Sequence, residues 1–151
     1  MSTIPKITLF TIGTVKKSAG KFFGMLDKAG VRRVIDIRLN NTSQLAGFTK
    51  REDLRFFLKT ISGIDYLHMP ECAPTKEILK EYRQKGSLWQ TYEKKFLELI
   101  LERRIENALG QEIAHLGCLL CSEQTPEFCH RRLVAEYLAD KWKHVEIVHL
   151  V

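Results

Sequence analysis

A dense group of reactive side chains occupies residues 118–132, in the stretch CLLCSEQTPEFCHRR. From Cys121 onward, it contains two thiols, two carboxylates, an imidazole and two guanidinium groups. Thiols and carboxylates serve as nucleophiles, acids and bases in enzymes, and guanidinium groups bind anions. The stretch is therefore the first place to look for a functional site.

Two elements are expected to position these groups. The apolar run Gly117–Cys121 predicts a buried strand. Thr125-Pro126-Glu127 is typical of a helix start, which predicts a helix from Pro126 with Cys129 and His130 at the end of its first turn. The carboxyl end of a strand would then meet the amino end of a helix, where α/β sheets bind ligands and where the helix dipole favours an anion.

The rest of the chain alternates between strand and helix patterns. Strands are expected at Lys6–Ile12, Val31–Arg38, Ile64–His68, Ile113–Cys121 and His144–Val151. Helices are expected at Ser18–Ala29, from a capping box at Thr49 to Gly63, at Thr75–Lys85, from a second capping box at Ser87 to Leu109, and at Pro126–Lys141. This order predicts one α/β domain over residues 1–151. We expect a three-layer sandwich with a mainly parallel sheet of about five strands and helices on both faces.

Composition narrows the class of protein. No apolar run is long enough to cross a membrane and no signal peptide is recognisable, so we expect a cytoplasmic protein without a membrane partner. The four cysteines are then expected as reduced thiols. The net charge of +6 permits an anionic small molecule or a nucleic acid as partner. The sequence carries no signal for the oligomeric state.

The ends of the predicted strands bring further polar residues to the same edge of the sheet. The candidate catalytic residues are Glu123, Cys121, His68 and Asp36. The candidate substrate-binding residues are Arg38, Arg131, Gly13, Thr14, Ser43, Cys129 and His130. Because the carboxyl ends of parallel strands share one edge, we expect these residues to surround a common site.

Each candidate also has a structural interpretation. Asp36 and Arg38 could form an ion pair that orders the following loop, and His68 could cap its strand. Cys121 could be a small buried apolar side chain. Glu123 could form a salt bridge with an arginine instead of transferring protons.

Several known sites are disfavoured. A phosphatase loop requires an arginine six residues after the cysteine, and Glu127 occupies that position after Cys121. Cys118 and Cys121 should point to opposite faces of their strand, and adjacent ligands in a helix, as at Cys129 and His130, seldom converge. The sequence therefore predicts neither a metal site nor a bound cofactor, and it contains no Gly-rich phosphate loop or dinucleotide fingerprint.

The motif Cys121-x-Glu123-x5-Cys129-His130-Arg131 resembles the carboxyl-terminal signature of the domain-of-unknown-function family numbered 488. Earlier blocks resemble that family in the same order: Thr11-Ile12-Gly13, Asp36-x-Arg38 with Ser43 and Phe48, and Tyr66-x-His68. The resemblance implies a small single-domain α/β protein and a site, but no reaction.

The chain also departs from the family pattern. Gly13-Thr14-Val15 stands where the family usually has Gly-His-Ser, so no role of that histidine carries over. Asn41 replaces a usual proline, and Ala73-Pro74 a usual glycine pair. The chain would thus be a variant whose substrate can differ.

Three hypotheses about function follow. In the first, the protein is an enzyme, a hydrolase or transferase, acting on a nucleotide, nucleic acid or other phosphate-bearing substrate. Arg38 and Arg131 would bind the anion, Glu123 would act as acid or base, and Cys121 or His68 would assist. The alternatives are a non-catalytic module that binds nucleic acid or protein, and a redox or metal sensor that uses Cys121 and Cys129.

Overall fold

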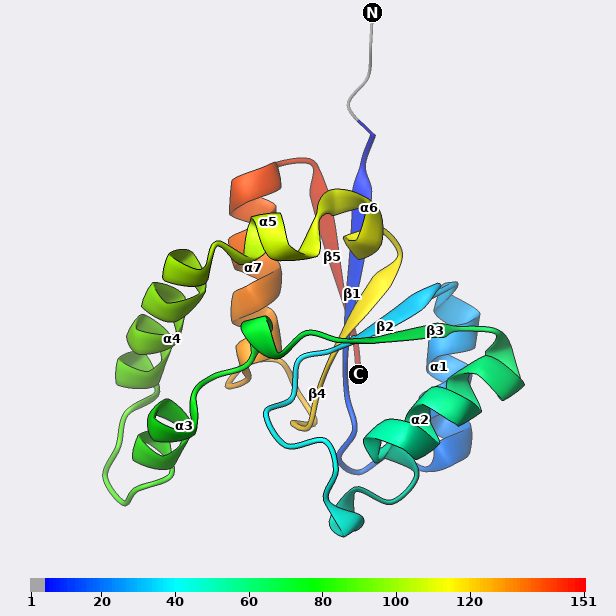
Figure 1. The fold of residues 1–151 in the computed structure, drawn as a ribbon, viewed down its shortest axis with the longest axis horizontal. Coiled ribbons are helices and arrows are strands. Elements are labelled where there is room, and N and C mark those ends of the chain that lie inside the picture. The colour runs from blue at the N-terminus through cyan, green and yellow to red at the C-terminus, as the bar shows by residue number, and fades with distance from the viewer. Residues whose placement is uncertain (1–4) are drawn as a thin grey trace, which may run out of the picture.

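A single parallel sheet forms the centre of the molecule (Figure 1). The computed structural model describes residues 5–151, and their side chains except those of residues 44 and 45. The strands are β1 (Ile7–Gly13), β2 (Arg33–Asp36), β3 (Asp65–His68), β4 (Gly117–Cys121) and β5 (Val145–Leu150). Their order is β3-β2-β4-β1-β5, and every neighbouring pair is parallel. The predicted α/β class with a mainly parallel sheet of about five strands is confirmed.

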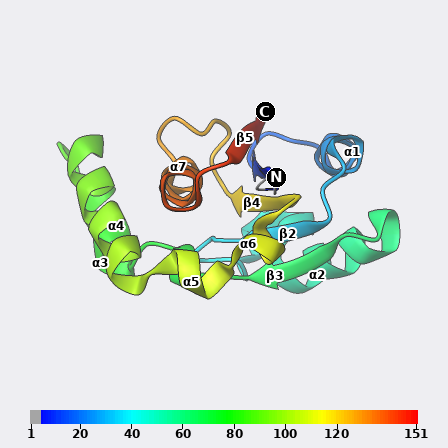
Figure 2. The ribbon, with the colours of Figure 1, turned by 90° about the horizontal axis from the view of Figure 1, so that it is seen from above.

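Helices cover both faces of this sheet, as Figure 2 shows from above. One face carries α1 (Ala19–Ala29) and α2 (Arg51–Phe57), which continues into a π-helical turn, η2 (Leu58–Ser62). The other face carries α3 (Lys76–Tyr82), α4 (Trp89–Arg103), α5 (Ile105–Leu109) and α7 (His130–Trp142). The short helix α6 (Gln111–Ala114) leads back into β4. The three-layer arrangement predicted from the sequence is therefore present.

Alternating strand residues divide the apolar core into two parts. In β4, Leu119 packs with residues of α4 and α7, whereas Cys118 and Leu120 pack with residues of α1 and α2. Cys121 contacts His130 of α7, so Cys118 and Cys121 point to opposite faces as predicted. Among residues 5–151, no helix has both the length and the apolar composition needed to cross a bilayer.

The helix predicted from Pro126 instead begins at His130. Cys129 is its N-cap, in extended conformation, and its sulfur accepts a hydrogen bond from the backbone N–H of Arg131. The Arg131 guanidinium donates to the carbonyl groups of Glu123 and Gln124, which holds this segment in a loop. The hydrogen bonds between Arg131 and this loop thus override the helix start expected at Thr125-Pro126-Glu127.

Two other element boundaries were predicted wrongly. The strand expected from Ile113 begins at Gly117, because residues 111–114 form α6 and Leu116 adopts a left-handed conformation (φ 60°). The helix expected at 87–109 is interrupted at Arg104 (φ 50°), which separates α4 from α5.

The two predicted capping boxes are also absent. The Thr49 hydroxyl donates to the Ala46 carbonyl, and the N-cap of α2 is Lys50. The Ser87 hydroxyl donates to the carbonyls of Tyr82 and Gln84 instead of capping α4. Both hydroxyls stabilise the turn that precedes the helix.

Candidate functional site

The candidate site lies where two neighbouring strands send the chain in opposite directions. After β2 the chain continues to α2 on one face of the sheet, and after β4 it continues to α7 on the other (Figures 1 and 2). The crevice at the carboxyl ends of such a strand pair is the usual ligand site of an open α/β sheet. The fold therefore places residues 37–43 and 122–129 on either side of it.

A cavity of about 710 Å³ occupies this position. The predicted site residues that line it are Thr14, Arg38, Ser43, Cys121, Glu123, Cys129 and His130. The predicted residues that are not part of its lining are Gly13, Asp36, His68 and Arg131. Most of the residues predicted for the site thus line one cavity, and the others are not part of its lining.

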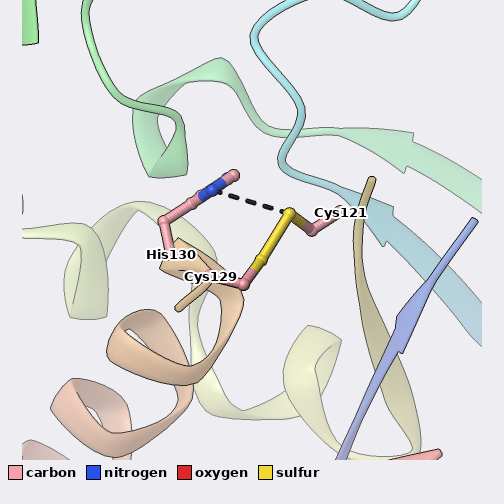
Figure 3. Close-up of side chains that lie close together, drawn as sticks. All are labelled: Cys121, Cys129 and His130. Carbon is pink, nitrogen blue, oxygen red and sulfur yellow. Dashed lines mark hydrogen bonds between the residues drawn. A yellow bond between two sulfur atoms is a disulfide. The ribbon is translucent and has the colours of Figure 1, made fainter. Parts of the chain in front are cut away.

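Cys121, Cys129 and His130, called here the Cys–His cluster, meet in this cavity (Figure 3). The sulfurs of Cys121 and Cys129 are joined as a disulfide, and the Cys121 sulfur lies 3.7 Å from Nδ1 of His130. The expectation of reduced thiols is therefore wrong for these two cysteines, whereas Cys72 and Cys118 are free. The expectation that Cys129 and His130 diverge is also wrong, because Cys129 is an N-cap and not a residue inside a helix.

The His130 ring is buried and held in a defined orientation. Its Nε2 lies 2.7 Å from the carbonyl oxygen of Ile37, to which it donates. Burial lowers the pKa of His130 to about 4; the bond to Ile37 opposes this shift, and the charge of Arg131 adds to it. The ring is therefore neutral at pH 7, and its Nδ1 lone pair is directed at Cys121.

Arg131 fixes the loop that carries Glu123. It is fully buried, and its Nη1 donates to the Glu123 carbonyl at 2.7 Å while Nε donates to the Thr11 hydroxyl at 3.3 Å. Burial lowers the pKa of Arg131 to about 10, so the guanidinium is still charged at pH 7. Arg131 therefore holds the Glu123 loop against β1 and does not itself line the cavity.

Gly13 permits this loop to approach β1. A Cβ atom at Gly13 would lie 1.6 Å from the Glu123 carbonyl oxygen and 3.2 Å from Nη1 of Arg131. Any side chain would displace the loop, because real Cβ atoms do not approach backbone so closely. The glycine at this predicted site position is therefore required by packing.

Asp36 lies in a separate, closed group of polar side chains, called here the Asp36 network: Asp36, Arg38, Asn41 and Tyr66. The carboxylate is inaccessible to solvent and accepts bonds from Nε and Nη2 of Arg38, both at 2.9 Å. It also accepts from Nδ2 of Asn41 at 3.2 Å and from the Tyr66 hydroxyl at 2.5 Å. This geometry matches the structural interpretation of an ion pair that orders the following loop.

The network sets the ionisation of its members. Burial alone would raise the pKa of Asp36, but the bonds and charge of Arg38, with the Tyr66 bond, outweigh it and hold that pKa below its usual value. Burial and the bond to Asp36 raise the pKa of Tyr66. His68 lies at the edge of this group, with Nε2 3.4 Å from the Arg38 carbonyl oxygen.

An aromatic and basic wall of the cavity was not anticipated from the sequence. The aromatic wall, as it is called below, consists of Tyr82, Trp89, Tyr92 and Phe128. The ring centroids of Trp89 and Tyr92 are 5.0 Å apart and nearly parallel, and those of Trp89 and Phe128 are 5.6 Å apart. Lys76 and Arg83 line the same cavity from α3 and its C-terminal end.

The sequence contained a partial signal for this wall. Trp89, Tyr92 and Phe96 recur at helical spacing, which indicates one face of a helix but not what that face contacts. Only the packing of α3 and α4 beside α7 brings these rings to the carboxyl ends of β2 and β4. The complete cavity offers cations, flat apolar surfaces, the Glu123 carboxylate and the Cys–His cluster.

Comparison with known proteins gives a family but no function. No curated protein and no solved structure matches the chain. The family model described as "Domain of unknown function DUF488" matches residues 18–138, a segment that contains the Asp36 network and the Cys–His cluster but not Gly13. The resemblance drawn from the sequence motifs is thereby confirmed: the chain belongs to the DUF488 family.

Proposed function

We propose that the protein is an enzyme that acts on a nucleotide, a nucleic acid or a similar phosphate-bearing substrate in the 710 Å³ cavity. The observation that carries this proposal is the combination, in one cavity, of the aromatic wall, three cationic side chains and the Cys–His cluster. Cationic groups bind phosphate, and aromatic rings stack on nucleobases whatever their sequence. A substrate with both features would use both parts of the cavity.

The cations of the proposed site are Arg38, Lys76 and Arg83. Arg38 has Nε and Nη2 bonded to Asp36, so its position is fixed, and none of these bonds uses Nη1. Lys76 and Arg83 are on the opposite, helical side of the cavity. Arg131, assigned to anion binding from the sequence, is replaced in this role because its guanidinium holds the loop at Glu123.

Glu123 is the proposed proton-transfer group. It lines the cavity and is exposed, and its backbone is held by Arg131, so its side chain has a defined point of attachment and access to a ligand. The Cys–His cluster is the proposed reactive centre, because it brings sulfur and an unprotonated imidazole nitrogen to the same cavity. Asp36 and His68 do not line the cavity, and we assign them supporting roles.

The test is turnover of a panel of nucleotides and short oligonucleotides by reduced protein, followed by mass spectrometry of the products. We expect the Glu123→Gln variant to lose about 10²-fold or more in rate, as removal of a general acid or base commonly does. Glu127→Gln is the matched control, since Glu127 is exposed in the same loop and does not line the cavity. Equal rates for Glu123→Gln and the unmodified protein would contradict the proposal.

The same panel separates the alternative of a binding module. Salt-dependent binding of DNA or RNA without any product would favour a non-catalytic module, since binding to phosphate groups releases counterions and is therefore weakened steeply by added salt. Turnover that depends on Glu123 would exclude it.

A further inference from the structure

We propose that Cys121, Cys129 and His130 bind a zinc ion when the two thiols are reduced, with the fourth coordination position open to the cavity. One ligand atom from each residue lies within 4.8 Å of the other two, and all three residues are buried. A disulfide needs only the two sulfurs, whereas here the Nδ1 atom of His130 also points at the Cys121 sulfur. Two thiolates and an imidazole are a ligand set that zinc prefers.

The spacing between the Cys121 sulfur and the His130 nitrogen fits tetrahedral zinc. With zinc–sulfur and zinc–nitrogen bonds of about 2.3 and 2.0–2.1 Å, sulfur and nitrogen ligands of one ion lie about 3.6 Å apart. The Cys121 sulfur and His130 Nδ1 are 3.7 Å apart. The Cα atoms of Cys121 and Cys129 are 7.4 Å apart, beyond the range of about 4.4–6.8 Å usual for a disulfide. Once the bridge is opened, this backbone spacing allows the two sulfurs to separate and bind one ion.

The second nitrogen of His130 has the partner expected of a zinc ligand. Nε2 donates to the Ile37 carbonyl at 2.7 Å, so the proton is on Nε2 and Nδ1 is free to coordinate. Histidine ligands of metals usually donate their other N–H to a carbonyl or carboxylate, which fixes the ring and its tautomer. Here that bond ties the ligand to the backbone just after β2, across the cavity from the cysteines.

The surroundings also suit bound thiolates. The Arg131 backbone N–H donates to the Cys129 sulfur at 3.5 Å, and Cys129 caps the 13-residue helix α7. Unpaired N–H groups and the helix dipole stabilise negative charge at this position. A Zn²⁺ ion with two thiolates and a neutral imidazole carries no net charge, which reduces the cost of burial.

Zinc binding and the disulfide exclude each other. An external dithiol can open the bridge by exchange: its own two sulfurs become joined, and each cysteine sulfur gains one electron and one proton. Zinc then replaces the two thiol protons and binds both thiolates. The disulfide form in Figure 3 is thus the oxidised, metal-free form of the same site.

The open position gives the ion a role in the proposed reaction, and this step rests on the proposed function. Zinc lowers the pKa of a bound water to about 7. The bound ion would supply activation of a water molecule, and Glu123, which lines the same cavity, would be placed to accept the proton of that water.

The test is titration of metal-stripped protein with Co²⁺, under argon and with a phosphine reductant that does not compete for the metal. We expect one Co²⁺ per chain, sulfur-to-cobalt charge-transfer bands, the intense visible bands of a tetrahedral site, and their loss on adding Zn²⁺. Cys129→Ser and His130→Gln should each weaken binding by about 100-fold or more, since each removes one of three protein ligands. The oxidised protein should show no such bands.

Cys118→Ala is the matched control, because Cys118 is in the same strand but in the opposite core. Cys72→Ala, in another buried position, replaces it if that variant does not fold. Reduced protein without the cobalt bands, or bands that survive in both Cys129→Ser and His130→Gln, would overturn the proposal. Nucleotide binding to metal-free protein is measured separately, so loss of the zinc site and loss of the proposed substrate can be told apart.

Discussion

Two groups of polar side chains lie at the carboxyl ends of neighbouring strands. The carboxylate of one is enclosed by the protein, and the other group faces a cavity. At the end of β2, the Asp36 carboxylate is enclosed by donors from Arg38, Asn41 and Tyr66. At the end of β4, the Cys–His cluster has protein contacts on one side and a cavity of about 710 Å³ on the other. The same edge of the sheet thus carries a closed polar network and a cluster that faces a cavity.

This difference separates residues that stabilise the fold from residues that can bind or react with a ligand. A buried charge with all its partners stabilises the loop it belongs to, and removing one partner leaves the other charge uncompensated. Polar groups that are oriented by the protein but still face a cavity can bind something else. Variants of Asp36 or Tyr66 should therefore affect mainly stability, whereas variants of the residues that line the cavity should affect mainly binding.

The largest expected effect comes from Asp36→Ala. It leaves the Arg38 guanidinium, only 3% exposed, without its counter-ion, which typically costs about 3–5 kcal/mol. The measurement is the free energy of unfolding in urea. Asp65→Ala is the control, because its pair with Lys59 is exposed and should contribute at most about 1 kcal/mol. Similar losses in both variants would remove the distinction between the two strand ends.

The next effect concerns the close approach between β1 and the loop after β4. Gly13→Ala places a Cβ against the Glu123 carbonyl, so we expect a loss of about 1–3 kcal/mol and weaker ligand binding as the loop moves. Gly24→Ala is the matched control, since a Cβ there meets nothing within 4 Å inside α1 and should stabilise by about 0.5–1 kcal/mol. Urea unfolding compares the two, and an unaffected Gly13→Ala variant would contradict the packing argument.

The pH dependence of the stability of Tyr66→Phe tests the Asp36 network. Its hydroxyl donates to the ionised Asp36, and such a bond contributes about 1.5–3 kcal/mol. Asp36 has a lowered pKa in the folded protein, so this stabilisation is fully present above the unfolded carboxyl pKa of about 3.9 and is lost as pH falls through the lower folded value. We expect the stability difference between the unmodified protein and Tyr66→Phe to shrink in that acid range. A difference that stays constant from pH 7 to that range would show that the bond does not depend on the charge.

The smallest effect on stability should come from the aromatic wall. Trp89→Leu keeps an apolar side chain but removes a surface on which a base can stack, so nucleotide affinity should fall about 10-fold. Loss of the ring contacts with Tyr92 and Phe128 should lower the free energy of unfolding by only about 0.5–1.5 kcal/mol. Trp142→Leu is the control, because Trp142 ends α7 and does not line the cavity. Calorimetric titration with a mononucleotide measures both, and equal affinities would remove the wall from the proposed site.

The sequence predicted the sheet well and brought several candidate residues to the lining of one cavity, because both results depend on local patterns. Apolar runs marked the strands, and polar residues after them marked the edge that now holds Arg38, Cys121 and Glu123. What it missed depends on contacts between distant segments. The start of α7 is set by Arg131 bonding to the preceding loop, and the pairing of Cys121 with Cys129 follows from that shift. The aromatic wall required the packing of α3 and α4, which no spacing in the sequence specifies.

The central position of β4 has a consequence for synthesis of the chain. β4 is the strand that connects the β1–β5 pair to the β2–β3 pair, and it is completed only at residue 121 of 151. As the chain leaves the ribosome, β1 therefore has no neighbour until more than one hundred later residues have emerged, while β2 and β3 can pair with each other. Long-range pairing of this kind slows folding and leaves strand edges exposed. The nascent protein must keep an apolar amino-terminal strand from aggregating until its partner arrives.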